Sequence, residues 1–144
     1  MALHNLDNLY RQAIMSYAQN PHHFHPVTAK DQYAVKKYNP TCGDVIEIAM
    51  TMNDQVIADI HFDGDGCAIS KASASIMTDL VLNKTLSEAQ NIISEFSKMA
   101  IGDVHDQLLL GEAELLAGVT KFPARIKCAT LAWHTLDELM VGKK

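Results

Sequence analysis

Long apolar runs and an excess of basic residues are both absent from this 144-residue sequence. No apolar segment is long enough to span a bilayer, and residues 1–5 lack the basic and apolar regions of a signal peptide. The formal net charge of −5 argues against a general binder of nucleic acid or of anionic membranes, since both need a basic surface. We therefore expect a cytoplasmic protein that binds neither.

Cysteine is scarce, and the three cysteines, Cys42, Cys67 and Cys128, are an odd number for a disulfide framework. In a reducing compartment, widely spaced cysteines near acidic residues are more often metal ligands or catalytic thiols. The alternative is that they are small buried hydrophobic residues. The sequence shows neither a glycine-rich phosphate loop nor a defensible Ser-His-Asp arrangement. The cysteines are therefore the main candidates for functional residues.

The length and composition fit one domain over residues 1–144, with 48% hydrophobic and 20% charged residues. Alternating apolar residues predict strands at 33–38, 45–52 and 56–62, the last two joined by a turn at Asn53-Asp54. On the third strand the apolar face comprises Val56, Ala58, Ile60 and Phe62, and His61 lies on the more exposed face.

Helical spacing of apolar residues predicts helices on either side of these strands. They fall at residues 6–17, 69–82 and 86–99, and from Phe122-Pro123 onward, with a capping box at Thr85 and Glu88. Segment 102–120 is divided by glycines, and we expect one or two helical turns there, with Leu108 to Leu110 and Leu115-Leu116 packed down. The predicted fold is α+β, a three-stranded antiparallel sheet covered on one face by helices.

Three histidines, His22, His23 and His25, lie close together between Pro21 and Pro26. Such a cluster can bind a metal ion. We favour an ordinary polar loop, because no helical or strand spacing aims the three rings at one point.

The cysteines have neighbours suited to a metal site. Gly43 lets the backbone fold back so that Cys42 and Asp44 can face one centre. Cys67 follows two glycines at the start of a predicted helix, where the helix dipole favours a thiolate. Cys128 lies near the start of the last helix. The cationic residues Arg125 and Lys127 come shortly before it in the sequence. Cationic neighbours lower the pKa of a thiol and attract anionic partners.

Three thiolates and one carboxylate suit a tetrahedral zinc ion. A carboxylate is a more replaceable ligand than cysteine or histidine, which suits a site that must release a thiolate for chemistry. Two alternatives remain open at this point. One is a closed structural zinc site, and the other is a pair of core cysteines with Asp44 as a helix N-cap.

Several motifs together resemble those of the IscU-like iron–sulfur cluster assembly proteins. They are Leu9-Tyr10-Arg11, Asn20-Pro21, Asn39-Pro40-Thr41-Cys42-Gly43-Asp44, Gly64-Asp65-Gly66-Cys67-Ala68-Ile69-Ser70 and the run from Lys121 to Leu131. The resemblance covers nearly the whole chain and implies the fold of SufE-like and IscU-like proteins. Lys127 stands where the scaffold proteins carry a histidine, and segment 102–120 is expanded. Both features resemble the SufU subtype.

The resemblance implies a zinc-dependent sulfurtransferase whose zinc is held by Cys42, Asp44, Cys67 and Cys128. Its partner is a SufS-type cysteine desulfurase, a pyridoxal phosphate enzyme, one of whose histidines displaces Cys42 from the metal. Cys42 then takes up persulfide sulfur and passes it to the downstream iron–sulfur assembly machinery. Arg125 is the implied residue for steering or docking. The alternative is a scaffold on which an iron–sulfur cluster is built, against which Lys127 argues, since lysine is a poor iron ligand at neutral pH.

Overall fold

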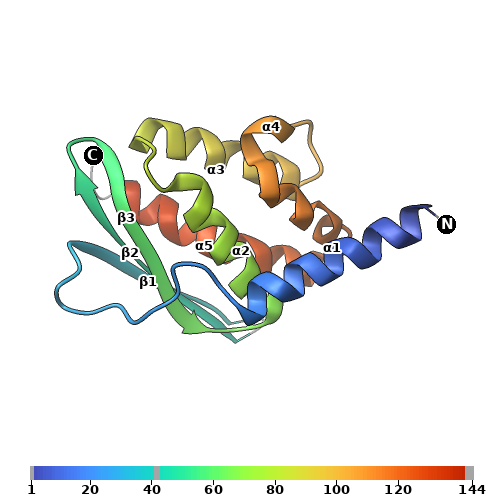
Figure 1. Ribbon diagram of the computed structural model, residues 1–144, viewed down its shortest axis with the longest axis horizontal. Coiled ribbons are helices and arrows are strands. Elements are labelled where there is room, and N and C mark those ends of the chain that lie inside the picture. The colour runs from blue at the N-terminus through green and yellow to red at the C-terminus, as the bar shows by residue number, and fades with distance from the viewer. Residues whose placement is uncertain (1, 41–42, 142–144) are drawn as a thin grey trace.

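The computed structural model describes residues 2–40 and 43–141. Its elements are α1 (Ala2–Gln19), β1 (Tyr33–Asn39), β2 (Asp44–Asn53), β3 (Val56–Asp65), α2 (Ala68–Val81), α3 (Leu86–Ala100), α4 (Gln107–Leu110), the 3₁₀ helix η1 (Gly111–Lys121) and α5 (Pro123–Val141). Figure 1 shows the sheet at one end of the molecule, α3 and α4 along the upper edge, and α1 projecting away toward the N-terminus. The predicted α+β class is confirmed.

The sheet has the order β1-β2-β3, and both strand pairs are antiparallel. Every second residue of β2, from Ile46 through Ile48 to Met50, is buried, as its sequence alternation predicts. Helix α5 packs on β1 and β2, and α2 packs on β3. On β1 the alternate residues Ala34 and Lys36 are exposed, so helices cover one face of the sheet, as expected.

The predicted alternation along β3 is wrong at its beginning. Thr51 pairs with Asp59 but Met52 pairs with Ile57, so the register shifts and Ala58 is an extra residue. Such a bulge reverses which side chains face the core. Ile57 is therefore fully buried and Ala58 is exposed, contrary to the prediction.

Helices α2, α3 and α5 meet around Trp133. Its ring stacks on that of Phe96, with centroids 3.9 Å apart and planes inclined by 5°. Its indole N–H donates to the Ser73 hydroxyl (2.8 Å), which in turn donates to the Ala129 carbonyl. A buried tryptophan N–H needs such a partner, so a serine in the middle of α2 satisfies a polar group in the core.

Segment 102–120 contains one α-helical turn, α4, followed by the 11-residue η1, so it is helical over more than the expected one or two turns. Leu110 and Leu116 are buried, but the Leu108 side chain is 96% exposed, so the prediction that Leu108 packs down is wrong. Asp106 caps α4, and its own N–H donates to Glu95 (2.7 Å). The hydrogen bond from Asp106 to Glu95 thus ties the start of α4 to α3.

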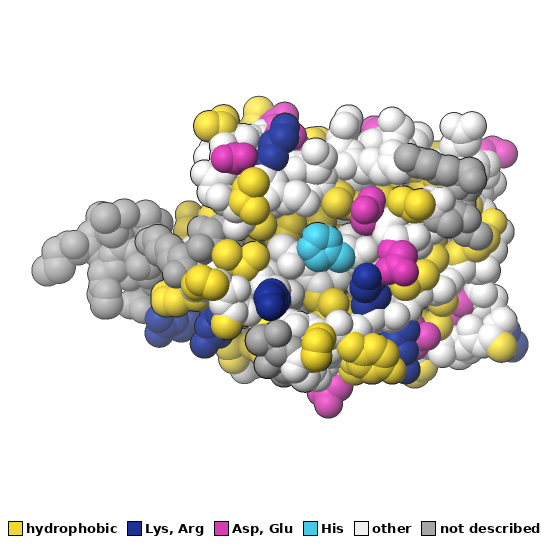
Figure 2. Space-filling view, turned by 180° about the vertical axis from the view of Figure 1, so that it is seen from behind, with side chains coloured by type: hydrophobic (Ala, Val, Ile, Leu, Met, Phe, Trp, Pro, Cys, Tyr) yellow, Lys and Arg dark blue, Asp and Glu magenta, His cyan; other side chains and the backbone are white. Residues whose placement is uncertain are grey.

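Among the described residues, no helix is long and apolar enough to cross a membrane. Figure 2 shows the face behind the view of Figure 1, where lysine, arginine and acidic side chains are interspersed with hydrophobic ones. No single sign of charge dominates the coloured part of that face.

His105 links the two ends of the segment between α3 and η1. Its Nδ1 lies 3.0 Å from the Asp103 carbonyl and its Nε2 lies 2.6 Å from the Glu114 carboxylate. The contact with the Asp103 carbonyl, aided by Glu114, raises the pKa of His105 despite partial burial. Because the folded-state pKa is raised, the stabilisation is fully present below the unfolded pKa of about 6.5 and is lost as the pH rises through the folded value.

We predict that His105→Gln lowers the free energy of unfolding more at pH 6 than at pH 9. Urea unfolding of both proteins at the two pH values measures this difference. His134→Gln, at an exposed position on α5, is the control and should show no such pH-dependent loss. An equal loss at both pH values for His105→Gln would contradict the prediction.

Candidate metal centre

The carboxylate of Asp44 is buried at the first residue of β2, with only 1% of the residue exposed. Its Oδ1 accepts a hydrogen bond from the Cys67 backbone N–H (3.0 Å) and its Oδ2 accepts one from the Ser70 hydroxyl (2.8 Å). Both donors belong to the start of α2. A buried carboxylate requires such partners, because leaving water without them is costly.

Two glycines allow the end of β3 to approach β2 closely. A Cβ at Gly66 would lie 2.7 Å from Asp44 Oδ1, and a Cβ at Gly64 would lie 2.1 Å from the Val45 carbonyl oxygen. Gly64 also has a φ of +140°, which L side chains rarely adopt. Only glycine therefore lets the chain pass the carboxylate and enter α2.

Cys67 is the N-cap of α2, as its sequence context predicts. Its Sγ accepts a hydrogen bond from the Ser70 N–H (3.5 Å). At a helix N-terminus the unpaired N–H groups and the helix dipole stabilise negative charge, so this position favours a thiolate.

Cys128 lies on α5, with 4% of the residue exposed, and packs with Ile69 and Ala129. Its thiol donates to the Ala124 carbonyl (3.7 Å), and its own carbonyl lies 3.2 Å from the Ser70 hydroxyl. Ser70 therefore lies between Asp44 and Cys128 and within hydrogen-bond distance of both. In the sequence Ser70 stands only at the end of the Cys67 motif, and its spacing alone does not predict this role.

The structure brings together three of the four predicted ligands. One carboxylate oxygen of Asp44 and the sulfurs of Cys67 and Cys128 all lie within 4.8 Å of one another. They come from β2, the start of α2 and α5. The fourth predicted ligand, Cys42, lies outside the described residues.

The donor atoms fit a metal centre. Two sulfurs and one carboxylate oxygen are a set that zinc accepts in tetrahedral sites, and a fourth ligand completes them. Thiolates also hold iron–sulfur clusters, so the donor set suits either cofactor.

Other predicted residues lie elsewhere. Arg125 is exposed in the first turns of α5, three residues before Cys128. His61 was expected on the more exposed strand face, and this is wrong, because only 3% of it is exposed. Its ring stacks on that of His25, with centroids 3.8 Å apart, and its Nε2 lies 3.3 Å from Asp31. The loop before β1 covers it, which strand alternation could not indicate.

The comparisons with known proteins agree with this geometry. The sequence model of the protein family named NifU-like N-terminal domain matches residues 9–129, which is most of the chain. The chain belongs to the NifU-like N-terminal domain family.

Two curated relatives carry different functional names. An iron–sulfur cluster assembly scaffold protein IscU of Streptococcus pyogenes serotype M1 is 48% identical over 139 residues, which is 96% of this chain and 86% of that protein. The zinc-dependent sulfurtransferase SufU of Bacillus subtilis is 44% identical over 135 residues, 93% of this chain and 90% of that protein. The two relatives therefore differ in the activity that their names give.

A solved structure of an iron–sulfur cluster assembly scaffold protein for the SUF system supports the fold. FiSufU of the thermophile Fervidobacterium islandicum AW-1 matches with a TM-score of 0.80 and 29% sequence identity. The match covers 89% of this chain and 93% of that one.

We predict that Ser70→Ala weakens zinc binding about 10-fold or more, because outer hydrogen bonds to a metal ligand contribute about 10–100-fold to metal affinity. The change removes the hydroxyl that contacts Asp44. Competition with a chromophoric zinc chelator measures the affinity.

The matched control is Ser73→Ala, one turn further along α2, whose hydroxyl contacts Ala129 and Trp133 instead. It should lower the melting temperature and leave zinc affinity unchanged. Equal zinc affinities for the two variants would show that Ser70 does not support the centre.

Proposed function

We propose that this protein is a zinc-dependent sulfurtransferase that accepts persulfide sulfur from a SufS-type cysteine desulfurase and passes it on for iron–sulfur cluster assembly in the cytoplasm. The observation that supports it most is the convergence of Asp44, Cys67 and Cys128 within 4.8 Å in a chain 44% identical to a zinc-dependent sulfurtransferase.

Cys42 is the proposed acceptor and fourth metal ligand. It lies two residues before Asp44 in the sequence, so chain connectivity keeps the two Cα atoms within about 7 Å. Zinc bound by Cys42, Asp44, Cys67 and Cys128 would keep the thiols deprotonated at neutral pH.

In the transfer, the Cys42 thiolate attacks the outer sulfur of the desulfurase persulfide. The new bond joins Cys42 Sγ to that sulfur, the sulfur–sulfur bond of the donor breaks, and the donor cysteine leaves as a thiolate. Atoms and electrons balance without an external oxidant or reductant. The product is a persulfide on Cys42 that the assembly machinery consumes.

Asp44 has a separate role in this proposal. Its two oxygens already accept hydrogen bonds from Cys67 and Ser70, so it can remain buried while another ligand leaves the metal. A carboxylate is also a harder ligand than a thiolate, which suits a centre that exchanges ligands.

A scaffold on which an iron–sulfur cluster is built is the second candidate, because a relative at 48% identity carries that name. Lys127, the residue before Cys128, is exposed and offers no ligand atom at neutral pH. A cluster would therefore depend on Cys42, Cys67 and Cys128, with Asp44 as the remaining ligand.

We expect zinc-loaded wild-type protein to stimulate a SufS-type desulfurase strongly, and Cys42→Ala to give no stimulation, because the variant lacks the acceptor thiol. The measurement is alanine formed from L-cysteine with iron excluded. Persulfide labelling followed by mass spectrometry should place sulfur on Cys42.

Two results would overturn this. Persulfide appearing on Cys42→Ala would remove Cys42 as the acceptor. Stimulation by neither protein would leave the scaffold as the better candidate, and a transferable cluster after iron and sulfide reconstitution would establish it.

Arg125 is the proposed docking residue. We expect Arg125→Glu to raise the protein concentration needed for half-maximal desulfurase stimulation about 10-fold, with the maximal rate changed less, since surface charges chiefly alter association. Lys84→Glu, an equal charge change at another exposed position, is the control. The same effect from both variants would indicate net charge and not a specific contact.

A further inference from the structure

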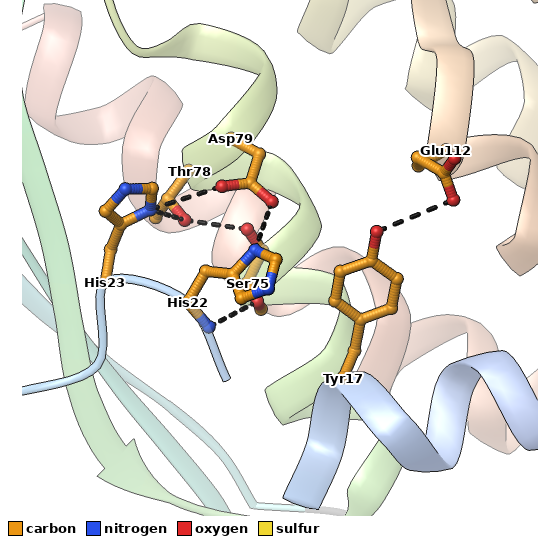
Figure 3. Close-up of polar contacts among 7 residues, drawn as sticks. All are labelled: Tyr17, His22, His23, Ser75, Thr78, Asp79 and Glu112. Carbon is orange, nitrogen blue, oxygen red and sulfur yellow. Dashed lines mark hydrogen bonds and ion pairs between the residues drawn. The ribbon is translucent and has the colours of Figure 1, made fainter. Parts of the chain in front are cut away.

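The loop between α1 and β1 brings two of its three histidines to one carboxylate on α2. His22 Nδ1 lies 2.5 Å from Asp79 Oδ2, and His23 Nδ1 lies 3.4 Å from Asp79 Oδ1. Figure 3 shows both rings beside Asp79, with the dashed lines from His22 and His23 ending on different carboxylate oxygens. The sequence favours an ordinary polar loop here, since no local spacing aims the rings at one point, and Asp79 lies more than fifty residues away in the chain.

Further contacts to α2 fix this part of the loop. The His22 backbone N–H donates to the Ser75 hydroxyl (2.7 Å), and His23 Nδ1 lies 2.9 Å from the Thr78 hydroxyl. The side chains of His22, His23 and Asp79 remain 50%, 30% and 37% exposed. The three groups are held near one another and are open to ions from solution.

A pocket of about 340 Å³ lies beside His22 and is lined by residues of α1 and the loop, including Ser16, Tyr17 and Asn20. Burial, and then the carboxylates of Glu112 and Asp79, raise the pKa of Tyr17. Carboxylates that oppose the ionisation of a tyrosine create a negative potential, which attracts cations.

We propose that His22, His23 and Asp79 form a second metal site that takes a divalent first-row transition ion and is separate from the cysteine centre. Two imidazoles and one carboxylate are a recognised ligand set for such ions. The two Nδ1 atoms contact different oxygens of Asp79 and the ring centroids are 6.4 Å apart, so binding requires these exposed rings to rotate toward one common point beside the carboxylate.

The two sites lie apart along α2. Asp79 is nine residues beyond Ser70, or about 14 Å along the helix axis, and Ser70 contacts the cysteine centre. The second site contains no sulfur donor, so Co²⁺ bound there should have a different absorption spectrum from Co²⁺ bound at the cysteine centre.

The test uses tag-free full-length protein loaded with one equivalent of zinc and then dialysed against Co²⁺, with bound metals counted by elemental analysis. We expect close to one equivalent of Co²⁺ in addition to zinc. Its visible spectrum should lack the intense near-ultraviolet band of cobalt bound to thiolate, since the ligands are nitrogen and oxygen. Binding should also raise the melting temperature, because the ion ties the loop to α2.

Asp79→Asn and the double variant His22→Ala/His23→Ala should each lose the added Co²⁺ and retain the zinc, which also shows that they fold. His25→Ala is the matched control from the same loop, since His25 stacks on His61, and it should bind as the wild type does. No added Co²⁺ in the wild type, equal loss in His25→Ala, or a thiolate band would each overturn the proposal. Because the readout is metal count and spectrum, it stands apart from the desulfurase assay that tests the transfer function.

Discussion

The buried carboxylate of Asp44 is the constraint on which the centre depends. A carboxylate that is almost wholly removed from water must be paired with donors or with a cation. Here the Cys67 N–H and the Ser70 hydroxyl supply two hydrogen bonds, and Gly66 is the residue that permits the approach. These contacts hold the start of β2, the end of β3 and the start of α2 in one arrangement.

Helix α2 connects this centre to the rest of the molecule through its serines. Ser70 contacts Asp44 and the Cys128 carbonyl, Ser73 contacts α5, and Ser75 accepts the N–H of His22. Serine is a poor residue for a helix interior because its hydroxyl competes for backbone groups. In α2 the hydroxyls bind other elements instead, so the weak local propensity is compensated by tertiary contacts.

Much of the fold follows from local pattern in the sequence. Period-two alternation in β2 and the capping box at Thr85 predict elements that the structure contains. The bulge at Ala58 was missed because register depends on the partner strand, and local alternation does not report it. The burial of His61 and the approach of His22 to Asp79 were missed for a related reason, since both depend on a loop that folds back over distant residues.

The arrangement of the ligands also bears on the choice between a structural and an exchangeable metal. In small domains that need zinc to fold, the metal replaces a missing core. Here the stacked pair of Trp133 and Phe96 and the apolar face of β2 form a core that includes none of the three described ligands. Hydrogen bonds from the Cys67 N–H and the Ser70 hydroxyl also hold Asp44. We therefore expect that a ligand can leave such a centre without loss of the fold, which is the physical condition that transfer through an exchangeable thiolate requires.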